Sequence, residues 1–284
     1  SGHTDVVPVD GQAWTVPPFE LSEKDGNLYG RGAADMKGFI ACVLAAVPGL
    51  LAKPLRMPVH IALSYDEEVG CLGVRSLLAE LEQRAIKPAL CLIGEPTELK
   101  PVLGHKGKLA MRCDVQGAAC HSANARFDPP FSTVQTGLIS GGKALNIVPA
   151  DCSFDFEIRT LPDQNAHDVA RQLEQYARQH VVPEMQAINA SSDIRFSELS
   201  AYPGLATDAR GEAAKLIAEC CGSRDFTTVA FGTEGGLFDA IGIATVVCGP
   251  GSMDQGHKPD EFISVEQLDG CDRMLERLTQ ALRA

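Results

Sequence analysis

Apolar residues recur along the chain in two different textures. From residue 1 to about 105, short apolar runs alternate with segments of helical periodicity. The runs at 58–66 and 88–96 suit buried strands, and the segments at 36–51 and 73–85 suit helices. This alternation predicts a mostly parallel sheet covered by helices.

The pattern changes between residues 106 and 203. Longer alternating strands are expected at 108–117, 132–142 and 152–160, followed by an amphipathic helix at 165–181 and a strand at 193–202. The first texture then returns and closes with a helix at about 265–282. The chain therefore reads as a catalytic-type α/β domain in two parts, 1–105 and 204–284, interrupted by a smaller α+β domain at 106–203.

Composition narrows the class of partner. The 284 residues are 45% hydrophobic and carry a formal net charge of -12, without any block of Lys or Arg. This balance argues against nucleic acid or an anionic membrane surface as a partner and tolerates bound cations. We find no apolar stretch of the roughly 18 to 20 residues that span a bilayer, and no signal-peptide pattern at the start. A cytoplasmic protein is expected.

The ten cysteines show no C-x-x-C spacing. Cys42, Cys91, Cys113 and Cys248 lie within apolar runs, where a free thiol packs as a small hydrophobic group. We expect reduced core residues rather than a disulfide framework or a thiolate metal cage.

An acidic cluster, Asp66, Glu67 and Glu68, follows the apolar run 60–63 at the mouth of an expected buried strand. Side chains at the carboxyl ends of parallel strands converge in space. Other acidic residues and histidines end strands elsewhere, namely His3, Asp5, Asp35, Glu95 and His257. A group of Asp, Glu and His without cysteine suits one or two divalent ions such as Zn²⁺, Co²⁺ or Mn²⁺.

Each of these residues has an ordinary structural explanation when it is taken alone. A histidine after a strand is more often a satisfied polar residue than a ligand, and an acidic run is usually a solvated turn. Because these residues occur together at the strand ends of one α/β domain, a shared metal site explains them better than separate structural roles do. His3 and Asp5 also share a face of an extended chain, so Asp5 can accept a hydrogen bond from the imidazole and set its tautomer.

Seven segments resemble, in order, the motifs of the M20 family of metallopeptidases and deacylases. They are "GHTDVVPVD", "LYGRGAADMKG", "SYDEEVG", "IGEPT", "HS", "GGKALNIVPA" and "GHKPDEFI". The resemblance covers nearly the whole chain. It implies a zinc-peptidase-like catalytic domain with a mixed, mostly parallel sheet, interrupted by a ferredoxin-like lid domain.

Within this family, "LYGRGAADMKG", "FDPPFSTVQTG", "FGTEGGLF" and "GPGSMDQGHKPDEFI" most resemble the enzymes that remove the acetyl group from N2-acetyl-L-ornithine in arginine biosynthesis. Other M20 amide hydrolases stay open as alternatives, such as a succinyl-diaminopimelate desuccinylase, a dipeptidase or a carboxypeptidase. A non-catalytic metal-binding descendant is a further alternative, against which the intact Glu67 and ligand positions argue.

The resemblance implies a centre of two divalent ions, Zn²⁺ or Co²⁺. Asp35 would bridge the ions, with His3 and Glu95 completing one site, and Glu68 and His257 the other. Glu67 would be the general base that takes a proton from the water held between the ions and passes it to the leaving amine. Adjacent glutamates allow one to bind metal while its neighbour faces the water.

The remaining candidate residues are expected to contact the substrate. His121 resembles a lid histidine that reaches the partner subunit of a homodimer and stabilises the oxyanion, and Asn146 and Arg159 resemble residues that hold the α-carboxylate of an N-acyl amino acid. Arg159 also alternates with Phe154 and could be an ordinary exposed strand residue. For Glu234 we hypothesise an ion pair with the cationic side chain of the substrate.

The chain departs from the family pattern at two places. It begins two residues before His3, so several dozen family residues have no counterpart at that end. Only nine residues separate His121 from Phe131, and they include Pro129 and Pro130. A crossover helix between parallel strands needs about a dozen residues, so we expect either a reduced lid or a segment absent near 122–126.

Overall fold

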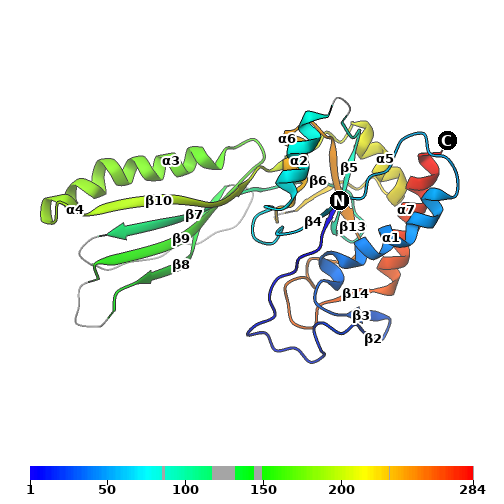
Figure 1. Cartoon of the computed structure of the whole chain (residues 1–284), viewed down its shortest axis with the longest axis horizontal. Coiled ribbons are helices and arrows are strands. Elements are labelled where there is room, and N and C mark those ends of the chain that lie inside the picture. Colours follow the sequence, from blue (N-terminus) through cyan, green and yellow to red (C-terminus); the bar gives the residue numbers. More distant parts are fainter. Residues whose placement is uncertain (85–86, 117–131, 144–148, 230, 284) are drawn as a thin grey trace. The chain divides into compact units, whose positions relative to one another are not determined.

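The computed structural model describes residues 1–84, 87–116, 132–143, 149–229 and 231–283. The chain divides into two compact units (Figure 1). Unit 1 comprises Ser1–His105 and Leu205–Ala284, and unit 2 comprises Lys106–Gly204. The inserted unit is thus one residue longer than the expected 106–203.

Unit 1 contains a short sheet at its centre and two smaller ones. Its strands are β1 (Gly2–His3), β2 (Ser22–Lys24), β3 (Asn27–Tyr29), β4 (Leu63–Ser64), β5 (Cys91–Pro96), β6 (Val102–His105), β11 (Leu205–Ala206), β12 (Thr227–Val229), β13 (Thr245–Gly249) and β14 (Phe262–Ser264). Its helices are η1 (Ala33–Lys37), α1 (Gly38–Leu51), α2 (Val74–Gln83), α5 (Glu212–Cys221), α6 (Gly235–Ala240) and α7 (Val265–Ala281).

The central sheet has the order β11-β6-β13-β5, with β12 also paired to β6. β13 and β5 are parallel, as are β12 and β6, whereas β6 is antiparallel to β13 and β11. All residues of β13 are buried, as expected for a strand that is covered on both faces. Figure 1 shows α1, α5 and α7 on the right of β5 and β13, and α2 and α6 on the left. The sheet is therefore mixed and flanked by helices, as predicted.

One strand prediction is wrong. The run 58–66 was expected as a buried strand, but only Leu63–Ser64 forms one, and Ile61 and Leu63 are 41% and 51% exposed. Among the described strands, β4 pairs with β1 alone, in parallel. Apolar character alone therefore does not bury this run, because a strand is buried only where neighbours cover its edge and its faces.

The helical stretch Ala33–Leu51 spans 19 residues with a hydropathy of 1.6, so by length and composition it could cross a membrane. This corrects the expectation that no apolar stretch reaches that length. Met36, Phe39 and Cys42 on this stretch belong to the core cluster of unit 1, which also includes Val246 and Met274. Core packing therefore accounts for part of the apolar sequence, since 28% of this window is buried while Leu44 and Leu51 are 55% and 80% exposed.

The cysteines of the described part of the chain are free. Cys42, Cys113 and Cys248 are buried, and Cys91 is partly buried. Cys42 and Cys248 belong to the apolar core of unit 1 and Cys113 to that of unit 2, as in the interpretation of the sequence.

Unit 2 contains one antiparallel sheet of four strands in the order β10-β7-β9-β8. Its elements are β7 (Gly107–Gln116), β8 (Thr133–Gly141), β9 (Asp151–Thr160), α3 (Ala166–Tyr176), η2 (Ala177–Val181), α4 (Val182–Ile188) and β10 (Asp193–Tyr202). Numbered within the unit, this is the order 4-1-3-2 of the ferredoxin-like arrangement. The first crossover, with the expected gap near 122–126, lies outside the described residues.

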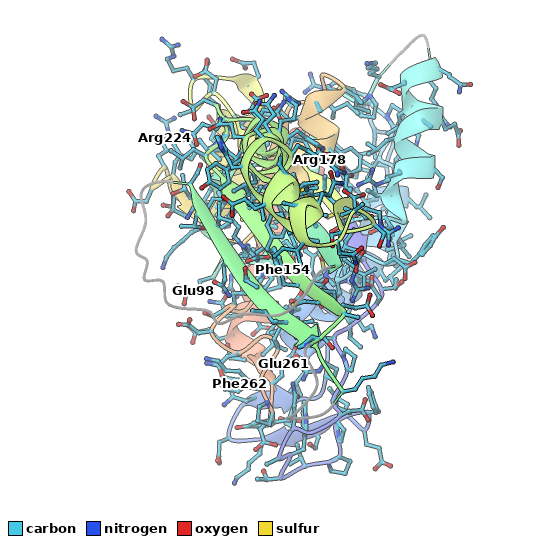
Figure 2. All side chains as sticks on the ribbon, turned by 90° about the vertical axis from the view of Figure 1, so that its left-hand side faces the viewer. Glu98, Phe154, Arg178, Arg224, Glu261 and Phe262 are labelled. Carbon is cyan, nitrogen blue, oxygen red and sulfur yellow. The ribbon has the colours of Figure 1, made fainter. Side chains whose placement is uncertain are left out.

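The helix of unit 2 covers its sheet through an apolar core. Phe154 (Figure 2) lies with its ring centroid 5.8 Å from that of Phe156, which is 6.3 Å from that of Phe196. Ala170 and Val182, from the helical layer, belong to the same core cluster. Asn165 caps α3 by accepting a hydrogen bond from the backbone N–H of His167. The helix thus begins where the amphipathic pattern at 165–181 predicts.

Candidate metal centre

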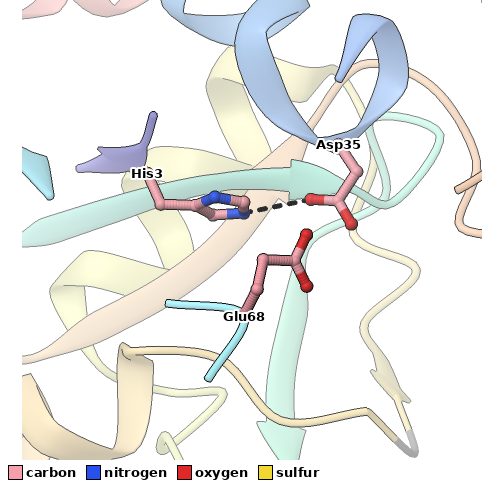
Figure 3. A group of neighbouring side chains, drawn as sticks. All are labelled: His3, Asp35 and Glu68. Atoms are coloured by element: carbon pink, nitrogen blue, oxygen red, sulfur yellow. Dashed lines mark hydrogen bonds and ion pairs between the residues drawn. The ribbon is translucent and has the colours of Figure 1, made fainter. Parts of the chain in front are cut away.

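Asp35 lies between two histidines in unit 1. Its Oδ1 is 3.1 Å from Nε2 of His3, and its Oδ2 is 3.1 Å from Nε2 of His257. Figure 3 shows the contact between His3 and Asp35, with the carboxylate of Glu68 directed at the same space. Asp35 is only 5% exposed. A carboxylate that presents one oxygen to each of two histidines has the geometry required to bridge two ions.

The other two predicted ligands each lie near one of these histidines. Glu68 Oε2 is 3.1 Å from Nε2 of His257, and Glu95 Oε1 is 3.9 Å from Nε2 of His3. Ligand atoms of His3, Asp35 and Glu68 lie within 4.8 Å of one another. Glu68 thus contacts His257 and Glu95 lies nearer His3, but a ligand atom of Glu68 also lies within 4.8 Å of one of His3, so the division of the five residues between two ions stays a prediction.

The strands of unit 1 explain this convergence. β1 and β4 are parallel, with His3 opposite Ser64, so the loop that carries Glu68 begins beside His3. β5 ends at Glu95 and Pro96, next to β13, whose following loop leads to His257. His3, Glu68, Glu95 and His257 therefore lie at or beyond the carboxyl ends of parallel strands, where α/β sheets build their sites, whereas Asp35 comes from η1, which follows the antiparallel strand β3.

Gly94 has a steric reason to precede Glu95. A Cβ atom at position 94 would lie 1.9 Å from Cδ1 of Phe39, which is closer than any carbon contact allows. The glycine lets α1 pack directly on β5. η1, which carries Asp35, directly precedes α1. The packing of α1 on β5 therefore places Asp35 near the strand that carries Glu95.

Asp5 contacts both His3 and the segment of Glu68. Nδ1 of His3 lies 3.0 Å from the backbone carbonyl oxygen of Asp5 and 3.4 Å from its Oδ1. Oδ2 of Asp5 accepts a hydrogen bond from the backbone N–H of Glu68 at 3.2 Å. A proton on Nδ1, donated to Asp5, leaves the Nε2 lone pair directed at the centre, as a metal ligand requires.

The electrostatics of the centre call for positive charge. Burial lowers the pKa of His3, but the hydrogen bond to Asp35 and the charge of Glu95 outweigh it and raise the pKa to about 11. Hydrogen bonds to Asp35 and Glu68 raise the pKa of His257 to about 10. Burial opposes the ionisation of Asp35, but hydrogen bonds from His257 and His3 hold its pKa below its usual range.

The buried carboxylates also favour additional positive charge at the centre. Burial, followed by repulsion from Asp35, raises the pKa of Glu95 well above its usual range. Without ions, protons on the two imidazoles compensate the negative charge. Divalent cations would supply that charge instead and bind the freed imidazole nitrogens. The oxygen and nitrogen donors fit Zn²⁺ or Co²⁺, so the residues present suit the expected metal centre.

Glu67 belongs to the same electrostatic cluster. Burial raises the pKa of Glu67 to about 7, with a further increase from the charge of Glu68 and an opposing effect from His3. Its Oε1 accepts a hydrogen bond from Sγ of Cys71 at 3.4 Å. A carboxyl group that titrates near neutral pH can both take up and release a proton, which is the property of a general base and acid.

The expected substrate residues are less well placed. His121 and Asn146 lie outside the described residues. In unit 2, Arg159 donates a hydrogen bond of 2.9 Å to Glu157. Glu234 is 1% exposed, and its Oε2 accepts a hydrogen bond from the Ser1 hydroxyl at 3.2 Å. The substrate roles of these four residues stay predictions.

The sequence analysis missed Glu261, although it lies in the quoted motif "GHKPDEFI". Its Oε1 accepts hydrogen bonds from the backbone N–H groups of Ala34 and Asp35, at 3.0 and 3.1 Å. In the structure, Glu261 also forms an ion pair with Arg31. The sequence shows only that these two residues lie within two separate motifs, and nothing in the local sequence indicates that they contact each other.

Comparisons with known proteins identify similar sequences. The sequence model described as "Peptidase family M20/M25/M40" matches residues 1–281. The acetylornithine deacetylase of Myxococcus xanthus is 36% identical, over 97% of this chain and 77% of that protein. The acetylornithine deacetylase of Pasteurella multocida (strain Pm70) is 32% identical, over 98% of this chain and 78% of that protein.

A solved structure shares the fold. The M20 family metallo-carboxypeptidase Sso-CP2 from Sulfolobus solfataricus superposes with a TM-score of 0.76 at 17% identity, over 98% of this chain and 83% of that chain. The alignment with the Myxococcus xanthus protein spans 307 positions, which exceeds the 284 residues of this chain. That relative therefore contains residues that have no counterpart here.

Proposed function

The chain belongs to the peptidase family M20/M25/M40, and from this premise we propose that it is a metal-dependent amide hydrolase that deacetylates N2-acetyl-L-ornithine to ornithine and acetate. The observation that carries the hydrolase is the position of Asp35 between His3 and His257. The choice of substrate is supported by the relatives at 32% and 36% identity, which are named acetylornithine deacetylases.

Five side chains would hold the two ions. Asp35 would bridge them, His3 and Glu95 would bind one, and Glu68 and His257 would bind the other. When bound, the ions polarise the amide carbonyl and lower the pKa of water from about 16 toward 7. Asp5 keeps the imidazole of His3 in the tautomer that binds metal.

Glu67 performs the proton transfers in this proposal. Its carboxylate takes a proton from the attacking water as the water oxygen forms a bond to the carbonyl carbon. The bond between that carbon and the nitrogen then breaks, and Glu67 returns the proton to the departing amine. The acetic acid that carries the new oxygen loses its remaining proton to solvent and leaves as acetate, and ornithine leaves as the amine.

A substrate panel tests the proposal. The chain is incubated with Zn²⁺ or Co²⁺ and with N2-acetyl-L-ornithine, N-acetyl-L-methionine, N-succinyl-diaminopimelate or a dipeptide. We expect release of acetate from acetylornithine with the highest kcat/KM, and its loss on chelation. A preference for the succinyl substrate or the dipeptide would replace the proposed substrate by one of the alternatives. Hydrolysis of none of the four, with metal bound, would contradict the hydrolase itself.

The expected homodimer stays a prediction. β8 forms an outer strand of the unit 2 sheet, and among the described strands it pairs with β9 alone. Leu138 and Ile139 on this strand are 69% and 68% exposed. An unpaired strand edge with exposed apolar side chains is suited to association with another chain. The mass of the particle in solution, measured by light scattering, tests this prediction.

A further inference from the structure

A buried ion pair lies behind the metal centre. Nη1 of Arg31 is 2.6 Å from Oε2 of Glu261, and both side chains are 1% exposed. Glu261 (labelled in Figure 2) directly precedes β14, whereas Arg31 precedes η1. Neither residue belongs to the ligand set described above. The mechanism therefore leaves two buried charges without a role.

Glu261 holds the backbone that carries Asp35. Its Oε1 accepts hydrogen bonds from the N–H groups of Ala34 and Asp35, while its Oε2 faces Arg31. Asp35 has φ of -117° and ψ of 92°, so it does not follow helical geometry, although it lies within η1. Its N–H group therefore needs a partner from outside the helix, and Glu261 supplies one.

Arg31 extends the same network toward His257. Its Nη2 donates a hydrogen bond to Oε1 of Gln12, and Nε2 of Gln12 donates a hydrogen bond of 3.0 Å to the backbone oxygen of His257. Trp14 contacts both Gln12 and Arg31. Its Nε1 donates a hydrogen bond to Oε1 of Gln12, and the centroid of its ring lies 5.0 Å from Cζ of the Arg31 guanidinium.

His257 benefits from such a contact for a conformational reason. Its φ is 64°, a left-handed backbone conformation that residues other than glycine adopt infrequently. The hydrogen bond from Gln12 holds the peptide group that follows this residue. The same arginine is thus linked through Glu261 to the backbone of Asp35 and through Gln12 to the backbone of His257.

Stability alone does not explain this choice of residues. A buried ion pair is often no more stabilising than apolar side chains of similar volume. Nε of Arg31 is also buried without a hydrogen-bond partner. An arrangement selected for packing would avoid this cost, so the contacts to the two ligand segments are the more specific reason for the pair.

We propose that Glu261, Arg31 and Gln12 form a positioning network that holds Asp35 and His257 at the separation that two divalent ions require. The inference rests on the metal-dependent function proposed above. None of the three residues belongs to the predicted ligand set. They act on metal affinity through the backbone of the ligands, as residues outside the ligand set do in other metal sites.

The test measures the affinity of the full chain for Zn²⁺ by competition with a chromophoric chelator, and the visible absorption of the Co²⁺-loaded protein. In Glu261→Gln, we expect an affinity about 10-fold to 100-fold below that of the wild type and an altered Co²⁺ spectrum. The matched control is Asp260→Asn, since Asp260 is the adjacent residue but binds exposed Thr15. We expect the control to keep the wild-type affinity and spectrum.

Gln12→Ala covers the case in which Glu261→Gln fails to fold. Gln12 is only partly buried, and its removal leaves the ion pair in place. We expect weaker binding of the ion that His257 would hold, since the variant loses the contact to the backbone of His257 together with the hydrogen bonds from Arg31 and Trp14. Circular dichroism of the metal-free variants confirms that each is folded at the temperature of the titration.

The outcomes separate the two proposals. A wild-type chain that binds two ions, together with folded variants of Glu261 or Gln12 that match its affinity and spectrum, would overturn the positioning network and leave the proposed function intact. A wild-type chain that binds no Zn²⁺ would overturn both proposals, because the centre itself would be absent.

Discussion

His257 Nε2 lies 3.1 Å from Oε2 of Glu68, although the two residues are far apart in the sequence. His257 follows β13 and Glu68 follows β4, which belong to two different sheets, so only the tertiary structure brings the two side chains together. Asp35 lies between this pair and His3. The contact defines one half of the candidate centre and leads to the first prediction.

Glu68→Ala removes a predicted ligand. We expect the affinity for the second ion to fall by at least about 10-fold, because even residues outside a ligand set typically contribute that much. Equilibrium dialysis with Zn²⁺, followed by metal analysis, measures the stoichiometry and affinity. Two ions bound as tightly as in the wild type would remove Glu68 from the ligand set.

Glu67→Gln should separate proton transfer from metal binding. The amide keeps the size of the side chain but cannot accept the proton, so we expect kcat to fall by about 10²-fold to 10⁴-fold while two ions stay bound. Asp66→Asn is the matched control, since Asp66 is the adjacent acidic residue and its side chain is exposed. Near-normal kcat in Glu67→Gln with both ions present would contradict the assignment.

The stability of the metal-free protein should depend on the protonation of His257. Hydrogen bonds to Asp35 and Glu68 raise its pKa to about 10 from the ordinary 6.5. Its stabilising contribution is then fully present below about pH 6.5 and is lost as the pH rises toward 10. We expect the melting temperature of chelator-treated protein to fall over this range, and to fall less in His257→Gln. His60→Gln, at an exposed position, should keep the wild-type slope.

Metal removal should lower both stability and activity. Binding to the folded state alone stabilises a protein by about 2.7 kcal/mol when free metal is at 100 times Kd. We expect chelation to lower the melting temperature and abolish turnover, and Zn²⁺ or Co²⁺ to restore both. Ca²⁺ serves as the control, since a centre with two imidazole ligands disfavours it. Equal restoration by Ca²⁺ would contradict the proposed donor set.

Glu234→Gln tests the expected contact with the substrate. If the carboxylate pairs with the cationic side chain of acetylornithine, the variant should lose activity toward this substrate and keep activity toward N-acetyl-L-methionine. The ratio of the two kcat/KM values is the measurement. Because Glu234 is 1% exposed and is bonded to Ser1, an equal loss for both substrates would indicate a structural role instead.

The local relations of the site could be predicted from the sequence. His3 and Asp5 are two residues apart in an extended segment, so their contact follows from strand geometry. Glu67 and Glu68 are adjacent, so one can face the centre as a ligand while the other accepts a proton. The alternation of strands and helices likewise predicted the α/β unit and the inserted sheet, because hydrophobic periodicity is set locally.

Contacts between distant segments were decided only by the tertiary structure. The run 58–66 reads as a buried strand, yet Leu63 is half exposed, because burial depends on the neighbours of a strand and not on its own residues. Arg31 and Glu261 form one ion pair from two separate motifs, and no local pattern encodes such a pairing. The sequence by itself determined which residue types and which periodicities are present. The packing of the sheets and helices decided which of these side chains meet, because tertiary contacts join residues that are remote in the chain.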